Sequence, residues 1–549
     1  MSTQNDVMKN RKEMQEIDRQ IQALNLRRNA LAPISSLPPE IMCMMFMLSS
    51  EMGRESRRVL EITHVCHQWR VLALGYPSLW ARPPLSDPRG TEEFLRRAEG
   101  APLGVSIFFT RENTKANIEA SAIVLDQMHR IRTLSLIVED RRPTRDVLDR
   151  LKKPAPLLED LEISPADAFT KHIVLFDRVT PALRSVSCFH WRFGSAEDLT
   201  LFRNIRELSL VHPRDRLSIR DTASLLQGMP SIESLVLDQV APEVIDLSRI
   251  SPIPVQKLQR VEISDTRLIQ CATMLAFLGL RNRPTLHLAT LLPTSPNNIE
   301  TAFRVIDPIL RLGHAPPFAS AEVTWEESDR FTISLWSTNE DATSPQTSRP
   351  HFSILLHTSE PCPLSLWCQY LPLSEIRSLS LDTCITIRSS RDMGWLRTFE
   401  SSHKIEALHA RKVAVQEAVE TLGAHLMHKW DYMDEPEEPY YSDEDDEDED
   451  SDYQTRLGKQ DHRLPKPAPP KRIFPQLKEL TLERWDLKDT VTMRSVQLSS
   501  VLEEIVKDRA ETGARLSLLR VRCTGIHKPA ANRLEANVDQ GVIDWQYMQ

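Results

Sequence analysis

The chain has 549 residues, of which 41% are hydrophobic and 26% are charged. A chain of this length does not bury a single core, so we expect two or more structural units. Glycine is scarce, with 15 residues, and proline is frequent, with 37. This balance disfavours phosphate-binding folds built on glycine loops and favours many short elements joined by turns.

One segment sets the sign of the net charge, which is −9. Residues 434–452 hold 13 acidic and no basic side chains, so the remainder carries −9 + 13 = +4. A near-neutral remainder gives no electrostatic reason to expect nucleic acid as a partner. The wider segment 433–472 is acidic and then contains Pro and Lys. We expect it to be a disordered insert, with a patch for a basic partner as the alternative.

The cysteine content and the hydropathy of the sequence indicate the cellular compartment of the protein. The eight cysteines form no C-x-x-C pair, which predicts neither a zinc ribbon nor a disulfide framework. The longest apolar run, residues 41–48, is too short to cross a membrane, and the polar N-terminus has no signal-peptide core. We therefore expect a cytoplasmic and/or nuclear protein that does not associate with a membrane.

Residues 1–33 predict a helix with apolar residues at heptad spacing. One heptad position holds Val7, Met14 and Ile21, and the other holds Ile17, Leu24 and Leu31. Asn10 and Arg28 interrupt the seam. The pattern is compatible with a short coiled coil, or with a single helix that packs on the next module.

Residues 34–82 predict a small helical module with more apolar surface than it can bury. Pro38 and Pro39 suit a helix start, and the helix that follows is apolar nearly all round. A second helical segment at 57–74 presents one broad apolar face. The spare surface must meet another protein or the rest of the chain.

These residues resemble the F-box-like motif of fungal proteins. The resemblance rests on Leu37-Pro38-Pro39-Glu40-Ile41 with Phe46, on Val65-Cys66-x-x-Trp69-Arg70, and on Ala73, Pro77, Leu79 and Trp80. Residues 94–107, within a connecting segment 83–124, are similar to the stretch that follows the motif in those proteins.

The resemblance implies a partner and a set of contacts. F-box modules dock on a Skp-type adaptor, which links them to a cullin scaffold and a RING subunit. The adaptor-binding residues implied here are Leu37, Pro38, Ile41, Phe46, Val65, Cys66 and Trp69. We expect Trp80 to belong to the core of the module itself.

Residues 125–430 repeat the phrase apolar-x-x-apolar-x-apolar. Its middle residue is Leu134, Leu161, Val186, Leu208, Leu235, Val261 and Leu286 in turn, at intervals of 27, 25, 22, 27, 26 and 25. Helices are predicted between the strands at 146–152, 196–203, 222–229 and 268–280. This period resembles that of leucine-rich-repeat proteins, which implies an irregular α/β solenoid, a curved parallel sheet with outer helices.

The rhythm changes near 320–358, where three segments alternate with period two and predict antiparallel strands in a β insertion. The phrase returns at 376–381 and 405–410, and an amphipathic helix follows. After the acidic insert, residues 473–549 are expected to form the terminal repeats and cap.

The sequence contains no motif for catalysis, for a metal or for a cofactor. His64, Cys66 and His67 lie close together but lack a fourth ligand at suitable spacing. We therefore predict a non-enzymatic substrate-recognition adaptor of an SCF-type E3 ubiquitin ligase whose solenoid binds an unknown target protein. The outward strand positions expected to face the target are Arg132, Glu159, Arg184, Arg206, Glu233 and Gln259.

Two other functions are compatible with the sequence. One is a leucine-rich-repeat scaffold or interaction protein without a ubiquitin ligase role. The other is an enzyme whose site lies in the 320–360 insertion, although no site motif supports it.

Overall fold

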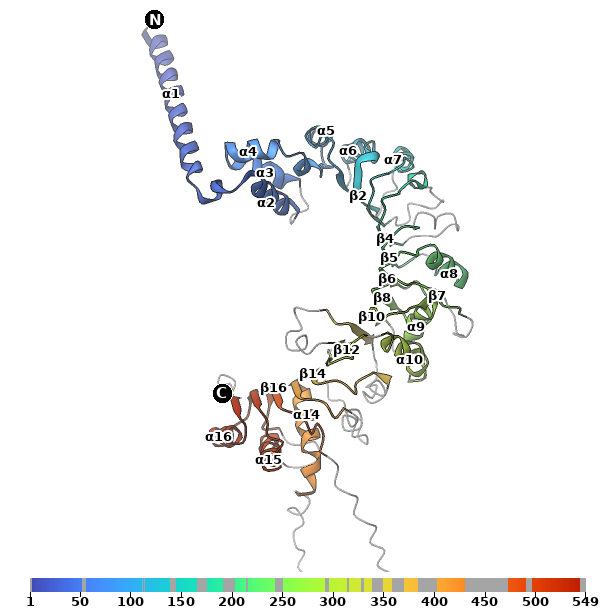
Figure 1. The fold of residues 1–549 in the computed structure, drawn as a ribbon. Helices are drawn as coiled ribbons and strands as arrows, with labels where there is room; N and C mark the ends of the chain where they lie inside the picture. The colour runs from blue at the N-terminus through green and yellow to red at the C-terminus, as the bar shows by residue number, and fades with distance from the viewer. Residues whose placement is uncertain are drawn as a thin grey trace, which may run out of the picture. The chain divides into compact units, whose positions relative to one another are not determined.

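The computed structural model describes residues 2–51, 56–110, 112, 114–138, 145–164, 175–190, 203–213, 216–241, 250–291, 296–313, 315–326, 330–337, 349–357, 370–383, 402–429, 472–489 and 496–543. The protein is mixed α/β, with a helical N-terminal region followed by strands that pair mostly in parallel (Figure 1). It divides into two compact units, residues 1–263 with 276–281, and residues 264–275 with 282–549. The predicted acidic insert lies outside the described residues, apart from Arg472.

The first unit starts with helices and continues as a parallel ladder. Its helices are α1 (Ser2–Ala30), α2 (Pro39–Glu51), α3 (Arg57–Val65), α4 (His67–Leu74), α5 (Pro88–Arg97), α6 (Lys115–Leu125), α7 (Arg145–Arg150) and α8 (Ile219–Gln227), with 3-10 turns η1 (Pro33–Ser36), η2 (Pro77–Trp80), η3 (Met128–Arg130) and η5 (Phe176–Arg178). Six strands pair in parallel, in the order β1 (Leu103–Phe109), β2 (Ile131–Val138), β3 (Asp160–Ser164), β4 (Ser185–Phe189), β5 (Glu207–Val211) and β6 (Ser234–Asp238). β8 (Arg260–Asp265) follows β6, and β7 (Ile253–Pro254) pairs with β9 (Leu278–Gly279).

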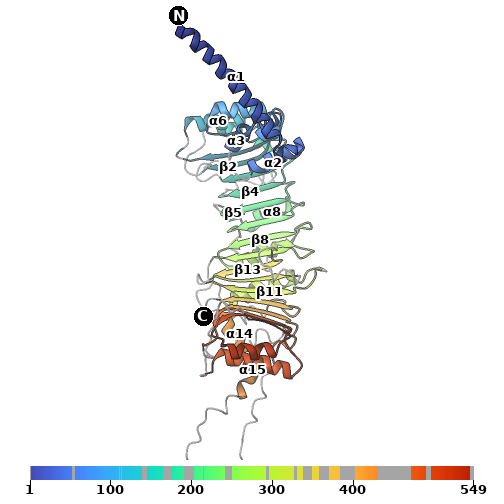
Figure 2. The same ribbon diagram turned by 90° about the vertical axis from the view of Figure 1, so that its left-hand side faces the viewer.

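The repeated phrase explains which face of these strands is buried. Successive side chains of a strand point to opposite faces, so in β2 Leu134 and Leu136 are buried while Ser135 between them is half-exposed. β3 to β6 repeat this alternation. Helices α6, α7 and α8 lie on one side of the strands, and the other side is open (Figures 1 and 2). The predicted parallel strands are confirmed; the helix predicted at 196–203 lies almost wholly outside the described residues.

The segment 83–124, predicted as a connection, contributes regular elements to the first unit. Asp87 caps α5 by accepting hydrogen bonds from the amides of Arg89 and Gly90. Thr114 and Asn117 form a reciprocal capping box at the start of α6. Between these helices β1 pairs with β2, so the ladder begins one strand earlier than the repeated phrase indicates.

The second unit holds the remaining elements. Its strands are β10 (Thr285–Thr290), β11 (Ser320–Trp325), β12 (Arg330–Trp336), β13 (Phe352–His357), β14 (Ser378–Thr383), β15 (Ala407–Lys412), β16 (Glu479–Asp486), β17 (Leu518–Thr524) and β18 (Gln540–Ile543). Its helices are α10 (Pro296–Leu310), α14 (Val413–Gly423), the 3-10 helix η8 (Ala424–Lys429), α15 (Leu498–Glu511) and α16 (Lys528–Ala536). α9 (Leu268–Phe277) lies mostly in this unit.

The β insertion is part of the sheet of the second unit. β12 pairs antiparallel with both β11 and β13, as predicted. β13 also pairs in parallel with β10, and β11 in parallel with β14. The order β10-β13-β12-β11-β14 therefore places the insertion inside the ladder, with β12 as the reversed strand.

Candidate docking surface on the N-terminal helices

Residues 34–82, here named the N-terminal module, form a small bundle in which α2, α3 and α4 lie together (Figure 1). α2 starts directly after Pro38, whose carbonyl accepts the amide of Met42 at 3.1 Å. Pro39 occupies the first turn, where its missing N–H costs nothing, and Glu40 faces the positive helix end. The sequence therefore fixes the start of α2 closely.

The module has a core of its own. The rings of Phe46 and Trp69 are 4.9 Å apart, and Trp80 is fully buried and donates its indole N–H to the carbonyl of Ala73 at 2.7 Å. Phe94 of α5 packs edge-on against Trp80 at 4.9 Å. The prediction that Trp80 belongs to the core is confirmed, and Trp80 also joins the module to α5.

The opposite side of α2 is apolar and exposed. Ile41, Met44, Met45 and Leu48 are 42%, 58%, 41% and 57% exposed. Their spacing of i, i+3, i+4 and i+7 places them in one stripe along the helix. We name these four residues the α2 stripe. An apolar stripe on a helix that is already packed on its other side is typical of a docking surface.

Further exposed apolar side chains lie on the two neighbouring helices. They are between 40% and 58% exposed and comprise Leu60 and Val65 of α3 and Val71 and Leu74 of α4. Single exposed apolar residues are ordinary, but this module concentrates several of them on three packed helices. It is therefore the part of the first unit best suited to bind an apolar partner surface.

The structure separates the predicted adaptor-binding residues into two groups. Pro38, Ile41 and Val65 are exposed, and Leu37, Cys66 and Trp69 are half-buried. Phe46 is only 2% exposed, so its assignment as a direct contact is wrong: its ring supports Trp69 from inside the module. Sequence reasoning missed Met44, Met45, Leu48, Leu60, Val71 and Leu74, although the all-round apolar character of residues 41–48 was a signal for the first three.

A second exposed surface lies where the strands of the first unit begin. Arg132 near the start of β2 and the residue just before each of β3, β4, β5, β6 and β8 form a backbone ladder, here named the strand-start ladder. From Glu159 onward, each residue donates its amide to the carbonyl of the residue one repeat earlier at 2.6–2.8 Å. The strand-start ladder consists of Arg132, Glu159, Arg184, Arg206, Glu233 and Gln259. These six residues were predicted to be outward strand positions, but all except Arg132 lie just before the strands. Arg132 pairs with Glu159 at 2.8 Å and Arg206 with Glu233 at 3.6 Å.

A shallow pocket opens on this ladder. Its wall carries positive charge from Arg184, Arg206 and Lys257 and one negative charge from Glu233, so its net charge is positive. Arg184 is exposed and has no side-chain hydrogen bond or ion pair among the described residues. The pocket can therefore accept an acidic side chain of a partner.

The open face of the second unit carries a charged cluster across β14, β15, β16 and β17. Glu483 lies 3.2 Å from Arg411, 3.1 Å from Arg522 and 3.4 Å from His409. Burial raises the pKa of Glu483, but the charges of His409 and Arg411 outweigh it, and this pKa lies below its usual value. Burial, helped by the charge of Arg411, lowers the pKa of His409.

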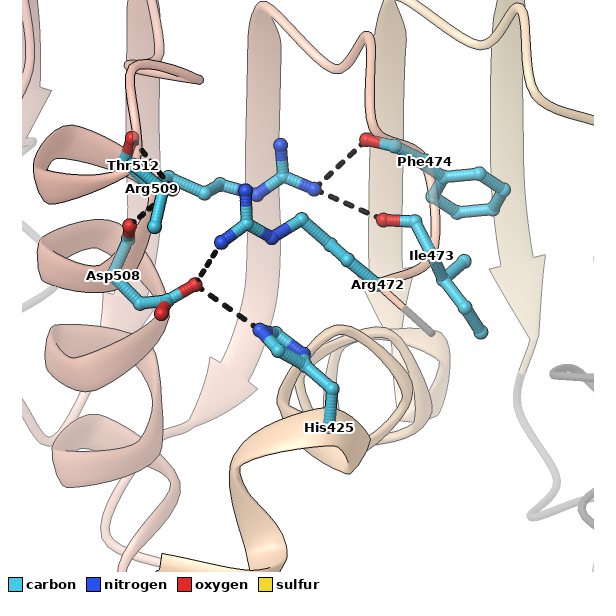
Figure 3. Close-up of polar contacts among 7 residues, drawn as sticks. All are labelled: His425, Arg472, Ile473, Phe474, Asp508, Arg509 and Thr512. Atoms are coloured by element: carbon cyan, nitrogen blue, oxygen red, sulfur yellow. Dashed lines mark hydrogen bonds and ion pairs between the residues drawn. The ribbon is translucent and has the colours of Figure 1, made fainter. Parts of the chain in front are cut away.

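A third polar cluster anchors the chain on both sides of the segment 430–471 (Figure 3). Asp508 of α15 accepts hydrogen bonds from His425, at 3.1 Å, and from Arg472. Burial raises the pKa of Asp508, but the hydrogen bond from His425 and the charge of Arg472 outweigh it, and its pKa is lowered. One carboxylate thus holds the residues that precede and follow the acidic insert.

The neighbouring Arg509 is 1% exposed and donates to the carbonyls of Ile473 and Phe474 at 3.0 and 2.9 Å (Figure 3). Burial lowers its pKa to about 10. Its hydrogen bonds satisfy main-chain groups, so this cluster is structural: it fixes the position of the chain just before β16.

No group of three or more His, Cys, Asp or Glu side chains in the described part of the chain is arranged to hold a metal ion. Among the described helices, none combines the length and hydropathy of a membrane-spanning segment.

Comparison with known proteins does not assign the chain: no protein-family model matches it, and no curated protein is similar to it. The α2 stripe and the strand-start ladder are therefore the features of the molecule that indicate a function.

Proposed function

We propose that this chain is a non-catalytic substrate receptor of an SCF-type ubiquitin ligase. Its N-terminal module acts as an F-box-like domain that docks on a Skp-type adaptor and, through it, on a cullin scaffold. The strands that follow in both units act as an irregular leucine-rich-repeat-like array that holds a target protein. The chain supplies no reacting group; it raises the concentration of the target beside the ubiquitin carrier.

The α2 stripe carries the docking half of this proposal. Fully burying one side chain of this size favours association by roughly 1.5–3 kcal/mol, so covering the exposed half of four of them contributes roughly 3–6 kcal/mol. Leu37 and Pro38 lie just before the stripe and extend it beyond the helix start. No described segment of the chain covers the stripe, which leaves it available to a partner surface.

The target-binding half is supported by the strand-start ladder. Its side chains are of mixed charge, with Arg184 and Arg206 as positive neighbours, and Arg184 has no side-chain partner among the described residues. Such mixed charge suits a protein surface better than a nucleic-acid backbone. The regular hydrogen bonds between successive repeats keep this surface in place before a target arrives.

Capture by an immobilised fungal Skp-type adaptor tests the proposal. We expect the full chain to bind, and Met44→Asp with Leu48→Asp to weaken binding by at least 100-fold, because two charges would enter an apolar interface. Both residues are exposed, so the variant should keep its thermal unfolding temperature.

Leu157→Asp with Val179→Asp is the matched control. These two residues are 47% and 43% exposed and lie in the first unit outside the module, so this variant should bind the adaptor like wild type. If wild type does not bind the adaptor, the chain is a repeat scaffold without a ligase role. Equal weakening by both variants would show that the stripe is not the docking site.

A further inference from the structure

Helix α1 presents an apolar seam that nothing in the described chain covers. Its seam residues are 49–79% exposed and comprise Val7, Met14, Ile17, Ile21, Leu24 and Leu31. The interpretation of α1 as a helix packed on the next module therefore disagrees with the structure. Leu31 follows the last helical residue, but its amide still hydrogen-bonds the carbonyl of Arg27 at 3.3 Å, so the seam continues to this residue.

A single amphipathic helix with an open seam is marginal in water, because its stability comes from burying that seam. Outside the seam α1 is mostly polar, with Met8 and Leu26 as exposed apolar exceptions, and Glu16 pairs there with Arg19 at 2.8 Å. The length of the seam, 25 residues from Val7 to Leu31, corresponds to roughly 36 Å of helix. A partner must therefore be a helix of similar length with a matching apolar seam, and a second copy of α1 has one.

We propose that α1 pairs with α1 of a second copy of this chain as an antiparallel two-helix coiled coil. In the register that places Ile17 of one chain beside Ile21 of the other, Val7 lies opposite Leu31 and Met14 opposite Leu24. The two polar residues of the seam, Asn10 and Arg28, then face each other. All other layers of this register are apolar.

The parallel arrangement is disfavoured by the seam itself. In a parallel pair each seam residue faces its own counterpart, so Arg28 would face Arg28 inside the interface. Two unpaired guanidinium groups in a partly desolvated seam repel each other and lose water without compensation. The antiparallel register removes this clash because Arg28 meets the side-chain amide oxygen of Asn10.

The flanking charges favour the same direction. Antiparallel pairing brings Glu13 of each chain beside Arg27 of the other, which makes two attractive pairs, and brings the two Asp18 side chains opposite each other once. Parallel pairing brings Glu13 beside Asp18 twice, which is repulsive, and Asp6 beside Arg11 twice, which is attractive, so its flanking charges cancel. The antiparallel register keeps one net attractive pair, and since exposed pairs of this kind are similar in size, the sum favours the antiparallel dimer.

Sedimentation of the full chain over a range of concentrations tests the dimer. We expect wild type to pass from the 62.9 kDa monomer to a species of twice that mass. Ile17→Asp with Ile21→Asp should remain a monomer throughout. Gln15→Asp with Gln22→Asp adds the same charge on the outer face of the helix and should still dimerise. A monomeric wild type, or a dimer that survives the seam variant, would overturn the proposal.

Charge reversal tests the direction. Arg27→Glu should raise the dimer dissociation constant about tenfold, because two attractive pairs with Glu13 become repulsive. Adding Glu13→Arg in the same chain should restore it. A parallel dimer makes the opposite prediction for Glu13→Arg alone, which would then bind Asp18 and tighten the dimer. A lower dimer dissociation constant in Glu13→Arg would contradict the antiparallel assignment. None of these readouts involves the ligase adaptor, so they stand apart from the proposed function.

Discussion

Arg509 shows how a charge can be buried for structural reasons. Its guanidinium lies within the second unit and holds two consecutive carbonyls, of which that of Phe474 also accepts the amide of Leu477. Removing Arg509 leaves the carbonyl of Ile473 without its described donor and a cavity beside it. We expect Arg509→Ala to lower the free energy of unfolding by about 3 kcal/mol.

Chemical denaturation followed by circular dichroism measures this loss. Lys507→Ala, an exposed change on the same helix, is the control and should cost less than about 0.5 kcal/mol. A loss of similar size in both variants would contradict the role given to Arg509.

His409 makes stability depend on pH in a direction that follows from its lowered pKa. An unfolded histidine titrates near 6.5, so below that pH the unfolded chain binds this proton more readily than the folded chain does. The contribution of His409 is therefore present above about pH 6.5 and is lost as the pH falls. We expect the unfolding temperature to fall from pH 7.5 to 5.5, and to fall less in His409→Gln. An equal fall in the variant would contradict this assignment.

Among the elements, α6 depends on its first turn. Thr114 accepts the amide of Asn117 at 3.3 Å, and Asn117 accepts the amide of Thr114 at 2.8 Å. Asn117 also donates to the carbonyl of Leu85 at 3.1 Å, which ties the cap to the preceding segment. We expect Thr114→Ala to destabilise the first unit by about 1 kcal/mol, measured by denaturation, whereas Thr114→Ser should retain most of the stability.

The helix α2 marks the limit of sequence reasoning at this scale. Its apolar residues occupy both faces, so periodicity predicts the helix but cannot say which face is inside. Met42, Cys43 and Phe46 turned inward because Trp69 gives Phe46 a partner there. Phe46 was consequently misassigned as a contact, and the α2 stripe emerged only once the packing was known.

At the scale of the whole molecule, the repeat interval predicted the parallel strands well because each apolar phrase is complete in itself. The interval could not predict that the β insertion would lie within the sheet. The neighbours of its strands depend on pairing between segments that are distant in the sequence. The six residues of the strand-start ladder were predicted as outward strand positions, but the pocket beside Arg184 was not predicted, since it needs Lys257 from a loop three repeats later.

The proposed target surface can be tested independently of adaptor docking. Arg184→Glu with Lys257→Glu reverses the charge of the pocket on the strand-start ladder, so we expect binding of an acidic target to weaken at least tenfold while adaptor capture is unchanged. Arg89→Glu with Lys115→Glu makes the same charge change at exposed positions elsewhere in the first unit. Target binding that ignores the pocket variant would move the target site to another surface.

The order of strands around β12 has a consequence for how the second unit is made. β10 finds its neighbour β13 only after the ribosome has added more than sixty residues, since Leu286 pairs with Phe352. Until then one edge of β10 has unsatisfied main-chain groups and is open to wrong pairing. Nascent chains that expose β10 but stop before residue 352 should therefore aggregate or recruit chaperones through this edge, whereas in chains past His357 the open edge is that of β11 until β14 has been added.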